Sequence, residues 1–336
     1  MSSVNIRYSQ FDLSSLVELL VKKYDLPEPL RCRFYKNGLN DVYKVTDNNG
    51  NGYFLRISLA GVHTTAEIDE EITIILSCRS ANLHVVEPVP CHDGNYVWNI
   101  SAPEGNRQAV LFREILNQPS GNPETMYRNL GQLIADIHTT SAVHAKDMHR
   151  PPIDRIILSE HPLELLKPYL SHRMADYDFM VRTNQILWNC ITEELADNPS
   201  FYGICHGDTQ PGNYYFNGET PILFDFDCMG CGYYAYDIGV LLANLTFMDN
   251  DIYKKTIWSQ VLEGYSSVRC LQPQEIRSIY AFAALQMMRV LAYHVESTEQ
   301  NSGIFYYTSD PHLDIFIGAY RRLYNVACEK CGISNK

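Results

Sequence analysis

The sequence predicts an α+β protein with two lobes, a small β-rich N-terminal lobe and a large, mainly helical C-terminal lobe. Residues with high strand propensity fill most of the first third of the chain. Apolar residues recur at helical spacing over most of the remainder. A break rich in Pro, Gly and Asn, NQPSGNPE at 117–124, separates the two patterns. We therefore place the lobes at residues 1–112 and 113–336.

Composition narrows the class of protein and its partners. The 336 residues are 46% hydrophobic and 20% charged, which is typical of a globular protein with a sizeable core. The formal net charge of −12 argues against a nucleic-acid binder, which is expected to be basic. No apolar run approaches the roughly 20 residues of a membrane helix, and the N-terminus does not resemble a signal peptide. We expect a cytoplasmic protein, monomeric or homodimeric, with no membrane or nucleic-acid partner.

The negative charge is concentrated in the second lobe. Residues 1–112 carry 10 basic and 13 acidic side chains, a balance of −3, whereas residues 113–336 carry 17 and 26, a balance of −9. The field of an acidic lobe favours a cationic small ligand. A negative net charge also serves solubility alone, so this observation leaves both interpretations open.

The ten cysteines are scattered and do not form a disulfide framework. Several lie inside apolar patterns, where a free Cys behaves as a small hydrophobic residue. Two Cys-x-x-Cys pairs, Cys228 with Cys231 and Cys328 with Cys331, could together bind zinc. Nearly a hundred residues separate the pairs, so the simpler expectation is unpaired thiols.

In the first lobe the pattern predicts strands and one helix. A hairpin is expected at the turn sequence NNGNG, and the predicted helix at 66–82 has apolar residues at Ile68, Ile72, Ile75 and Leu76. The predicted strands are 30–36, 41–47, 52–60, 85–90, 95–100 and 107–116.

In the second lobe the 3.6-residue periodicity predicts mainly helices, with one short β region between the second and the third of them. The predicted helices are 126–141, 175–198, 237–247, 253–265, 273–297 and 314–330.

The β region carries the chemistry. ICHGDTQPGNYYF (204–216) predicts a strand, a polar loop and a second strand, and PILFDFDCMG (221–230) returns as its partner. The hairpin brings Asp208 and Asn213 within reach of Asp225. Hard oxygen ligands of this kind suit Mg²⁺, which usually shares them with phosphates and water. An Asp, an Asn five residues later and a subsequent Asp follow the order of a protein-kinase catalytic loop and its metal-binding Asp.

Three motifs, HGDTQPGN, LFDFD and YAYDIG, resemble those of the aminoglycoside phosphotransferase and choline kinase family, which has the protein-kinase-like fold. The resemblance covers roughly residues 30 to 330. It implies that ATP and Mg²⁺ bind between the lobes, that Asp208 is the catalytic Asp, and that Asn213 and Asp225 hold the metal. Asp227 falls where many members carry a second acid, and would assist.

The same resemblance assigns supporting roles around the catalytic loop. His206 is implied as a scaffold residue of that loop. Asp237 is implied as the buried Asp that braces the loop through hydrogen bonds. A simple N-cap of the helix that follows is the alternative for Asp237, and the two roles are compatible.

In the first lobe the resemblance extends to the nucleotide phosphates. NGLNDVYKV (37–45) resembles the loop that covers them and includes Gly38 and Asn40. In YFLRI the family places a basic residue, often Lys, that contacts the phosphates, and here it is Arg56. Glu71 is the chosen ion-pair partner of Arg56, with Glu67 and Glu70 as alternatives. A plain surface ion pair is the structural alternative.

VLFREIL (110–116) resembles the connection between the lobes that meets adenine through its backbone. The residues implied in that contact are Phe112, Glu114 and Ile115. Arg289 and His294, on the predicted helix 273–297, could face the substrate, although ordinary helix-face residues with hydrogen-bond partners are the simpler interpretation.

The sequence therefore predicts an ATP- and Mg²⁺-dependent kinase that phosphorylates a hydroxyl of a small, amine-bearing acceptor. An aminoglycoside-like antibiotic, an amino alcohol or a hydroxy amino acid would fit. Two alternatives remain open, a protein Ser/Thr kinase of the same fold and a catalytically silent nucleotide-binding module. The intact set of Asp208, Asn213 and Asp225 argues against the silent module.

Overall fold

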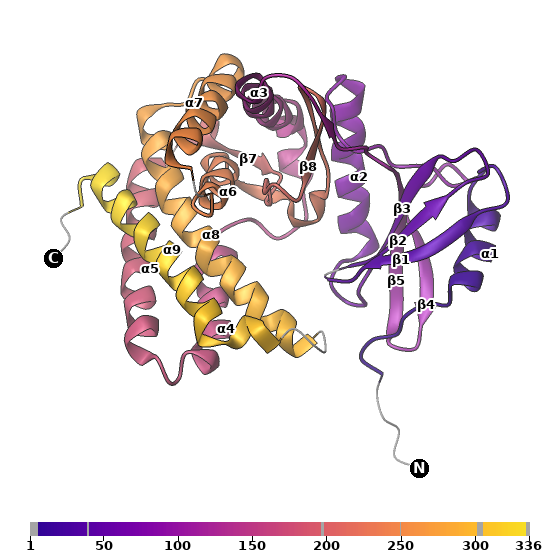
Figure 1. Ribbon diagram of the computed structural model, residues 1–336, viewed down its shortest axis with the longest axis horizontal. Helices are drawn as coiled ribbons and strands as arrows, with labels where there is room; N and C mark the ends of the chain where they lie inside the picture. Colours follow the sequence, from indigo (N-terminus) through magenta and orange to yellow (C-terminus); the bar gives the residue numbers. More distant parts are fainter. Residues whose placement is uncertain (1–5, 39, 196–197, 249, 301–304, 334–336) are drawn as a thin grey trace, which may run out of the picture. The chain divides into compact units, whose positions relative to one another are not determined.

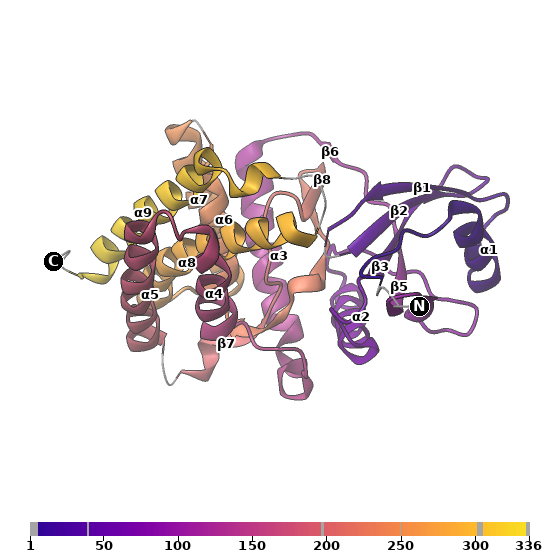
Figure 2. The same cartoon turned by 90° about the horizontal axis from the view of Figure 1, so that it is seen from below.

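The computed structural model describes residues 6–38, 40–195, 198–248, 250–300 and 305–333. The chain forms two compact units, residues 1–117 and 118–336. Figures 1 and 2 show the elements of each unit from two directions. No helix of the described residues combines the length and the apolar character needed to cross a membrane.

The first unit is built on an antiparallel five-stranded sheet with the strand order β1-β2-β3-β5-β4. The β2–β3 hairpin turns at residues 47–51, where Asp47 accepts hydrogen bonds from the backbone N–H groups of Asn49 and Asn51. The NNGNG turn is thereby confirmed. The strands are β1 (Arg31–Lys36), β2 (Asn40–Thr46), β3 (Gly52–Ser58), β4 (Trp98–Ala102) and β5 (Gly105–Arg113).

One face of this sheet packs on a helix that the sequence analysis did not predict, α1 (Leu13–Lys23). Leu16 and Leu20 of α1 join Leu55 and Ile57 of β3 in the core. Successive side chains of a strand point to opposite faces. Arg56, between Leu55 and Ile57, therefore points away from α1. It reaches Glu71 of α2 (Thr65–Ser80), which is the helix predicted at 66–82.

The prediction of a strand at 85–90 is wrong. The segment is extended, but it forms only an isolated bridge between Pro88 and Phe112 and a few backbone bonds to β5. Pro88 and Pro90 have no N–H to donate, so a regular ladder is not available to this segment.

The second unit is mainly helical, as predicted. Figures 1 and 2 both place α5 and α9 alongside the long central helix α8, and α6 also packs on α8. The helices are α3 (Pro123–Ser141), α4 (His161–Tyr169), α5 (Met174–Leu195), α6 (Ala235–Leu245), α7 (Asp251–Val268), α8 (Pro273–Gln300) and α9 (Asp310–Cys331). Helix α4 was not predicted; its Pro162 and Pro168 obscure a short apolar pattern.

The predicted β region is present as two small sheets. Strand β7 (Tyr202–Cys205) pairs with β10 (Gly230–Tyr233). Strand β8 (Tyr214–Gly218) forms a hairpin with β9 (Thr220–Leu223), and β6 (Gln118–Pro119) adds to β8 in parallel. This arrangement brings residues 206–213 and 224–227 together at the ends of β7, β8 and β9.

The expectation of unpaired thiols is wrong for one pair of cysteines. Cys190 of α5 and Cys331 at the end of α9 form a disulfide, across 141 residues of sequence. Their positions on two helices that flank α8 bring them together, which no local pattern could indicate. Cys228 and Cys328 are free thiols, and the Cys-x-x-Cys pairs form no metal-binding group among the described residues.

Candidate active site

Asp208 and Asn213 lie in one polar loop that joins β7 to β8. The Asn213 side-chain Nδ2 donates to the Asp208 carboxylate Oδ2 at 2.7 Å and to the Asp208 backbone oxygen at 2.9 Å. Gln210 Nε2 also donates to Oδ2, at 3.2 Å. Because both of these hydrogen bonds are donated by Nδ2, the other polar atom of the Asn213 side chain, Oδ1, is left to bind a cation.

The β8–β9 hairpin brings Asp225 beside Asn213. The backbone N–H of Phe224 donates to the Asn213 backbone oxygen at 2.9 Å, which extends the hairpin pairing by one step. Asp225 follows directly, in a left-handed conformation with φ of 64°. Few non-glycine residues adopt that conformation, although Asp does so more readily than most. The kink ends the strand, and the backbone turns at the point where Asp225 would present its carboxylate.

His206 ties the loop to the segment that carries Asp225. Its Nδ1 accepts from the backbone N–H of Asp208 at 3.2 Å, so the proton must lie on Nε2, which donates to the Phe224 backbone oxygen at 3.1 Å. The imidazole is buried and packs on the ring of Phe226. Both nitrogens are engaged in holding backbone groups, and this agrees with the scaffold role expected for His206.

The position between His206 and Asp208 requires glycine. Gly207 has φ of +83°, and a Cβ at this position would lie 2.0 Å from the backbone oxygen of Cys228. A side chain would push the loop away from the segment that follows Asp225. The His-Gly-Asp sequence is thus explained by a close approach of two backbone segments.

Asp237 braces the loop from α6. Its Oδ2 accepts from the backbone N–H of His206 at 2.7 Å, and its Oδ1 accepts from the backbone N–H of Gly207 at 2.8 Å. The N-cap of α6 is Tyr234, and Asp237 lies inside the first turn, so the N-cap interpretation of Asp237 is wrong. Burial alone raises the pKa of a carboxyl, but the interactions of Asp237 with His138 outweigh it and lower the pKa of Asp237.

A series of buried hydrogen bonds connects Asp237 to helices α3 and α7. Arg269 donates to the hydroxyl of Tyr265 at 3.3 Å, and that hydroxyl meets His138 Nδ1 at 2.8 Å. The Tyr265 hydroxyl then donates to Nδ1, which leaves the Nε2–H of His138 to donate to Asp237 at 2.9 Å. The sequence analysis missed these hydrogen-bonded residues, because they come from α3, α7 and the turn after α7 and share no motif.

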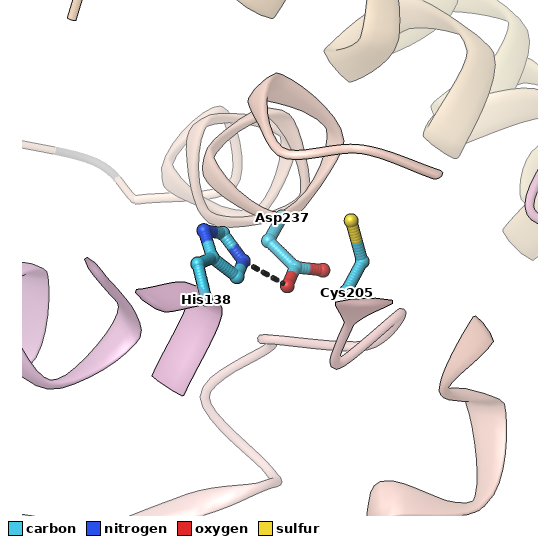
Figure 3. A group of neighbouring side chains, drawn as sticks. All are labelled: His138, Cys205 and Asp237. Atoms are coloured by element: carbon cyan, nitrogen blue, oxygen red, sulfur yellow. Dashed lines mark hydrogen bonds and ion pairs between the residues drawn. The ribbon is translucent and has the colours of Figure 1, made fainter. Parts of the chain in front are cut away.

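Figure 3 shows His138, Asp237 and Cys205 side by side, with ligand-type atoms within 4.8 Å of one another. This cluster does not fit a metal ion well. His138 and Asp237 are already committed to hydrogen bonds. Burial raises the pKa of the Cys205 thiol well above its usual range, and the thiol donates to the Tyr233 backbone oxygen at 3.4 Å. A metal ligand would need the thiolate. The cluster is a hydrogen-bonded support.

In the first unit, Arg56 and Glu71 form the predicted ion pair. The guanidinium makes two parallel bonds, of 2.8 and 2.7 Å, to the two oxygens of Glu71, and it lies over the ring of Phe112. The side chains are 8% and 0% exposed, so this is a buried, bidentate pair and the surface-pair alternative is wrong. Glu67 instead closes a capping box with Thr64 at the start of α2.

The remaining predicted nucleotide residues lie at or next to the ends of β2 and β5 of the same sheet. Gly38 lies in a bend before β2, and Asn40 begins β2 opposite Ser58. Leu39, between them, lies outside the described residues. The backbone N–H groups of Arg113 and Glu114 already donate to Glu87 and Gly52. In the segment predicted to meet adenine, Ile115 therefore offers the amide that has no partner among the described residues.

Two further arginines hold the backbone around the site. Sequence reasoning gave Arg150 no role and offered Arg289 only as a residue that could face the substrate. Arg150, which is buried, donates to the backbone oxygen of Asp227 at 2.6 Å. Arg289 of α8 donates to the backbone oxygen of Gly207 at 3.1 Å. Each comes from a segment far away in the sequence, and a lone Arg on a helix or loop carries no signal of its target.

A model of the phosphotransferase enzyme family, APH, matches residues 32–271. The chain belongs to this family. The match covers the phosphate-loop region, Arg56, Glu71 and the whole catalytic loop through Asp237. The resemblance read from the motifs is confirmed, and so is the predicted fold class.

The chain is also similar to individual proteins. The uncharacterized protein sll1119 of Synechocystis sp. (strain ATCC 27184 / PCC 6803 / Kazusa) is 31% identical over 296 residues, 86% of this chain and 80% of that protein. The amicoumacin kinase of Bacillus subtilis (strain 168) is 23% identical over 272 residues, 77% and 78% of the two chains.

Solved structures share the fold over nearly the full length. The amicoumacin kinase hAmiN, in complex with AMP-PNP, Ca²⁺ and Ami, has a TM-score of 0.73 at 19% identity and 94% coverage of both chains. The microcompartment-associated aminopropanol kinase has a TM-score of 0.74 at 20% identity, over 96% of this chain and 99% of that one. Membership of the APH family makes the chain a phosphotransferase, and these structures show the fold that it shares with them.

Proposed function

We propose that this chain is an ATP- and Mg²⁺-dependent kinase that transfers the γ-phosphate to a hydroxyl of a small, amine-bearing acceptor, with Asp208 as the catalytic residue. Two sets of hydrogen bonds carry the proposal. Asn213 Nδ2 donates two hydrogen bonds to Asp208, and the backbone N–H of Phe224 donates one to the backbone oxygen of Asn213. These bonds hold Asp208, Asn213 and Asp225 in one small region. That is the set of groups that phosphoryl transfer requires.

The donor set fits Mg²⁺. Asn213 Oδ1 and the Asp225 carboxylate are hard oxygen ligands, and Asp227 lies two residues further on. When bound, the ion would neutralise charge on the phosphates of ATP. Arg56, held by Glu71, is proposed to contact the same phosphates. Gly38 and Asn40 are proposed to cover them, and the backbone of Phe112, Glu114 and Ile115 to meet adenine.

The proposed roles of the chain's own residues follow from their surroundings. Asp208 is partly exposed, and the side chains of Gln210 and Asn213 both donate to its Oδ2. The other oxygen, Oδ1, is proposed to accept the hydrogen bond of the acceptor hydroxyl and orient it toward the γ-phosphorus. The hydroxyl oxygen forms its bond to phosphorus as the bond to the β–γ bridging oxygen breaks. ADP carries away the electron pair, and the hydroxyl proton passes to Asp208.

The choice of an amine-bearing acceptor rests on charge. Residues 113–336 carry a balance of −9, as 17 basic against 26 acidic side chains. An acidic lobe raises the local concentration of a cationic ligand. Amicoumacin and aminopropanol are the substrates named for the two structural relatives.

The test is phosphate transfer from labelled ATP with Mg²⁺ across aminoglycosides, amino alcohols, choline-like amines, hydroxy amino acids and nucleosides. Wild type and Asp208→Ala are compared on each compound. We expect turnover of one amine-bearing class, reduced by about a hundredfold or more in the variant. Turnover of neutral or acidic compounds alone would contradict the amine. Nucleotide binding without any transfer would favour a silent module, and labelling of added proteins would favour a protein kinase.

A further inference from the structure

Arg289 lies on helix α8 at the edge of the candidate active site. Its Nη1 donates to the backbone oxygen of Gly207, the residue before Asp208, and to the hydroxyl of Tyr236. That hydroxyl donates in turn to Gln286 at 2.6 Å, one turn earlier on α8. Tyr236 is fully buried and Gln286 nearly so. One nitrogen of the guanidinium is therefore fixed in place by a buried anchor.

The rest of this guanidinium is unused. Among the residues that the structure describes, Nη1 is the only nitrogen of Arg289 with a hydrogen-bond partner. Nε and Nη2 are not among the buried polar atoms that lack a partner, so they reach solvent. No ion pair within the described part of the chain includes Arg289. A partly buried cation thus keeps two nitrogens, Nε and Nη2, that are accessible and have no partner among the described residues.

The guanidinium lies near Asp208, because its Nη1 donates to the backbone oxygen of the preceding residue, Gly207. Burial lowers the pKa of Arg289, but Tyr236, Cys228 and Asp208 act in the opposite direction and the net pKa is raised, so the guanidinium stays charged. Tyr293, four residues later on α8, is on the same face of the helix and is 37% exposed. Asp208 and Asp225 both act on its hydroxyl. The Arg289–Tyr293 face of α8 therefore contacts the loop that carries Asp208 through Arg289.

A free guanidinium fork of this kind recognises a carboxylate or a phosphate. We propose that Arg289 binds the carboxylate of the acceptor, so that the acceptor is a hydroxy amino acid rather than an amino alcohol or an aminoglycoside. This inference rests on the proposed function and narrows its acceptor class. It assigns the amine of the acceptor to the acidic lobe and the carboxylate to Arg289. A short chain between carboxylate and hydroxyl suits the closeness of Arg289 to the loop that carries Asp208.

The test compares matched acceptors that differ by the carboxylate. The pairs are serine with ethanolamine, threonine with 1-amino-2-propanol, and homoserine with 3-amino-1-propanol, and kanamycin represents the aminoglycosides. We expect wild type to use the acid of at least one pair with a kcat/KM about tenfold to a hundredfold above that of its amino alcohol, the range of one charged hydrogen-bonded contact. Titration calorimetry with AMP-PNP and Mg²⁺ present should show the same preference in binding.

Variants of Arg289 then locate the source of the preference. In Arg289→Met the ratio of acid to alcohol should fall to about three or less, mainly through KM of the acid, and Arg289→Lys should retain part of it. Arg277→Met is the matched control, because Arg277 is on the same helix and pairs with Glu194. It should leave the ratio unchanged. Should Arg289→Met fail to fold, the lowered ratio in Arg289→Lys carries the test.

Two results would overturn the inference. One is turnover of amino alcohols or kanamycin in preference to every acid, which leaves the proposed function standing. The other is an equal loss for acid and alcohol in Arg289→Met, which would assign Arg289 to the transferred phosphate or to the loop. Absence of transfer to every acceptor contradicts the proposed function itself, and calorimetry then still shows whether Arg289 selects a carboxylate.

Discussion

Asp208 and Asp237 lie close together in the second unit but in opposite surroundings. Asp237 has no exposed surface, and its two oxygens accept from the N–H groups of His206 and Gly207 and from His138. Asp208 is partly exposed, and its carboxylate accepts from the side chains of Asn213 and Gln210. The same residue type is therefore a closed support in one place and, in the other, a partly open group that we propose to be the reactive one.

The difference shows how this site divides its tasks. A buried carboxylate that satisfies several backbone N–H groups fixes a loop, because leaving any of those groups unpaired is costly. A carboxylate that is held on one oxygen and open on the other can receive a substrate. We call the first group the support region (Asp237, His138, Tyr265 and Arg269) and the second the reacting region (Asp208, Asn213 and Asp225).

The largest effect is expected in the reacting region, at the proposed metal ligand. Asp225→Asn keeps the size of the side chain but removes the charge that would hold Mg²⁺. We expect kcat to fall by about a hundredfold to a thousandfold, the scale of losing one preorganised charge contact at the transferring group. The free energy of unfolding should change little. Steady-state assays over a range of Mg²⁺ concentrations measure this, with the exposed Asp314→Asn as control. Activity near that of wild type would remove Asp225 from the site.

A somewhat smaller loss is expected for Asn213→Ala. The substitution removes the two bonds to Asp208 and the amide oxygen offered to the metal. We expect kcat to fall by about tenfold to a hundredfold and the Mg²⁺ concentration for half-maximal rate to rise by about tenfold. Gln210→Ala, which loses only the 3.2 Å contact to Asp208, should stay within about threefold of wild type. Equal effects of the two substitutions would show that Asn213 has no special part.

The support region should respond in stability first. His138→Ala removes one buried hydrogen-bond partner from Asp237 and one from Tyr265. We expect the free energy of unfolding to fall by about 2–4 kcal/mol through the lost hydrogen bonds and the cavity. Denaturant titration measures it. The exposed His172→Ala, which loses a surface contact to Asp310, should change it by about 1 kcal/mol or less. Equal stabilities would contradict the division of tasks.

The smallest effect is expected on how the free energy of unfolding depends on pH in the acid range. The pKa of Asp237 is lowered below its usual value of 3.8 in the folded chain, chiefly by His138 against the opposing effect of burial. The unfolded chain therefore takes up a proton at this group before the folded chain does. Its stabilising contribution is present above about pH 4 and is lost as the pH falls through the folded pKa. The slope of unfolding free energy against pH, between pH 5 and 3, should be shallower in Asp237→Asn than in wild type, and an unchanged slope would refute this.

Much of the reacting region could be predicted because its members lie within 18 residues of one another. Asp208, Asn213 and Asp225 are joined by a hairpin, and hairpins are local structures that the sequence signals through strand propensity and turns. Asp237 could be predicted because it lies in the motif YAYDIG. The pairing of Arg56 with Glu71 was implied by the family resemblance, and Glu71 was chosen among three glutamates because it directly precedes the apolar spacing that begins at Ile72.

The support region could not be predicted in the same way. His138, Tyr265 and Arg269 belong to elements that meet only when the helices pack, and a single buried His or Tyr in an apolar pattern looks like core. The disulfide between Cys190 and Cys331 depends on the same packing. The missed helix α1 did carry a signal, since Asp12 caps it and Leu16 and Leu20 are spaced for one face. Two prolines, which lack the N–H of a ladder, explain the wrong strand at 85–90.

The division between the two aspartates is tested most directly by Asp208→Asn and Asp237→Asn, measured side by side for kcat and for the free energy of unfolding. With the best acceptor of the panel, we predict that Asp208→Asn lowers kcat by about a hundredfold or more. Its stability should stay within about 1 kcal/mol of wild type. Asp237→Asn should lose about 2 kcal/mol or more. A stable, active Asp208→Asn enzyme, or an Asp237→Asn enzyme as stable as wild type, would contradict the account.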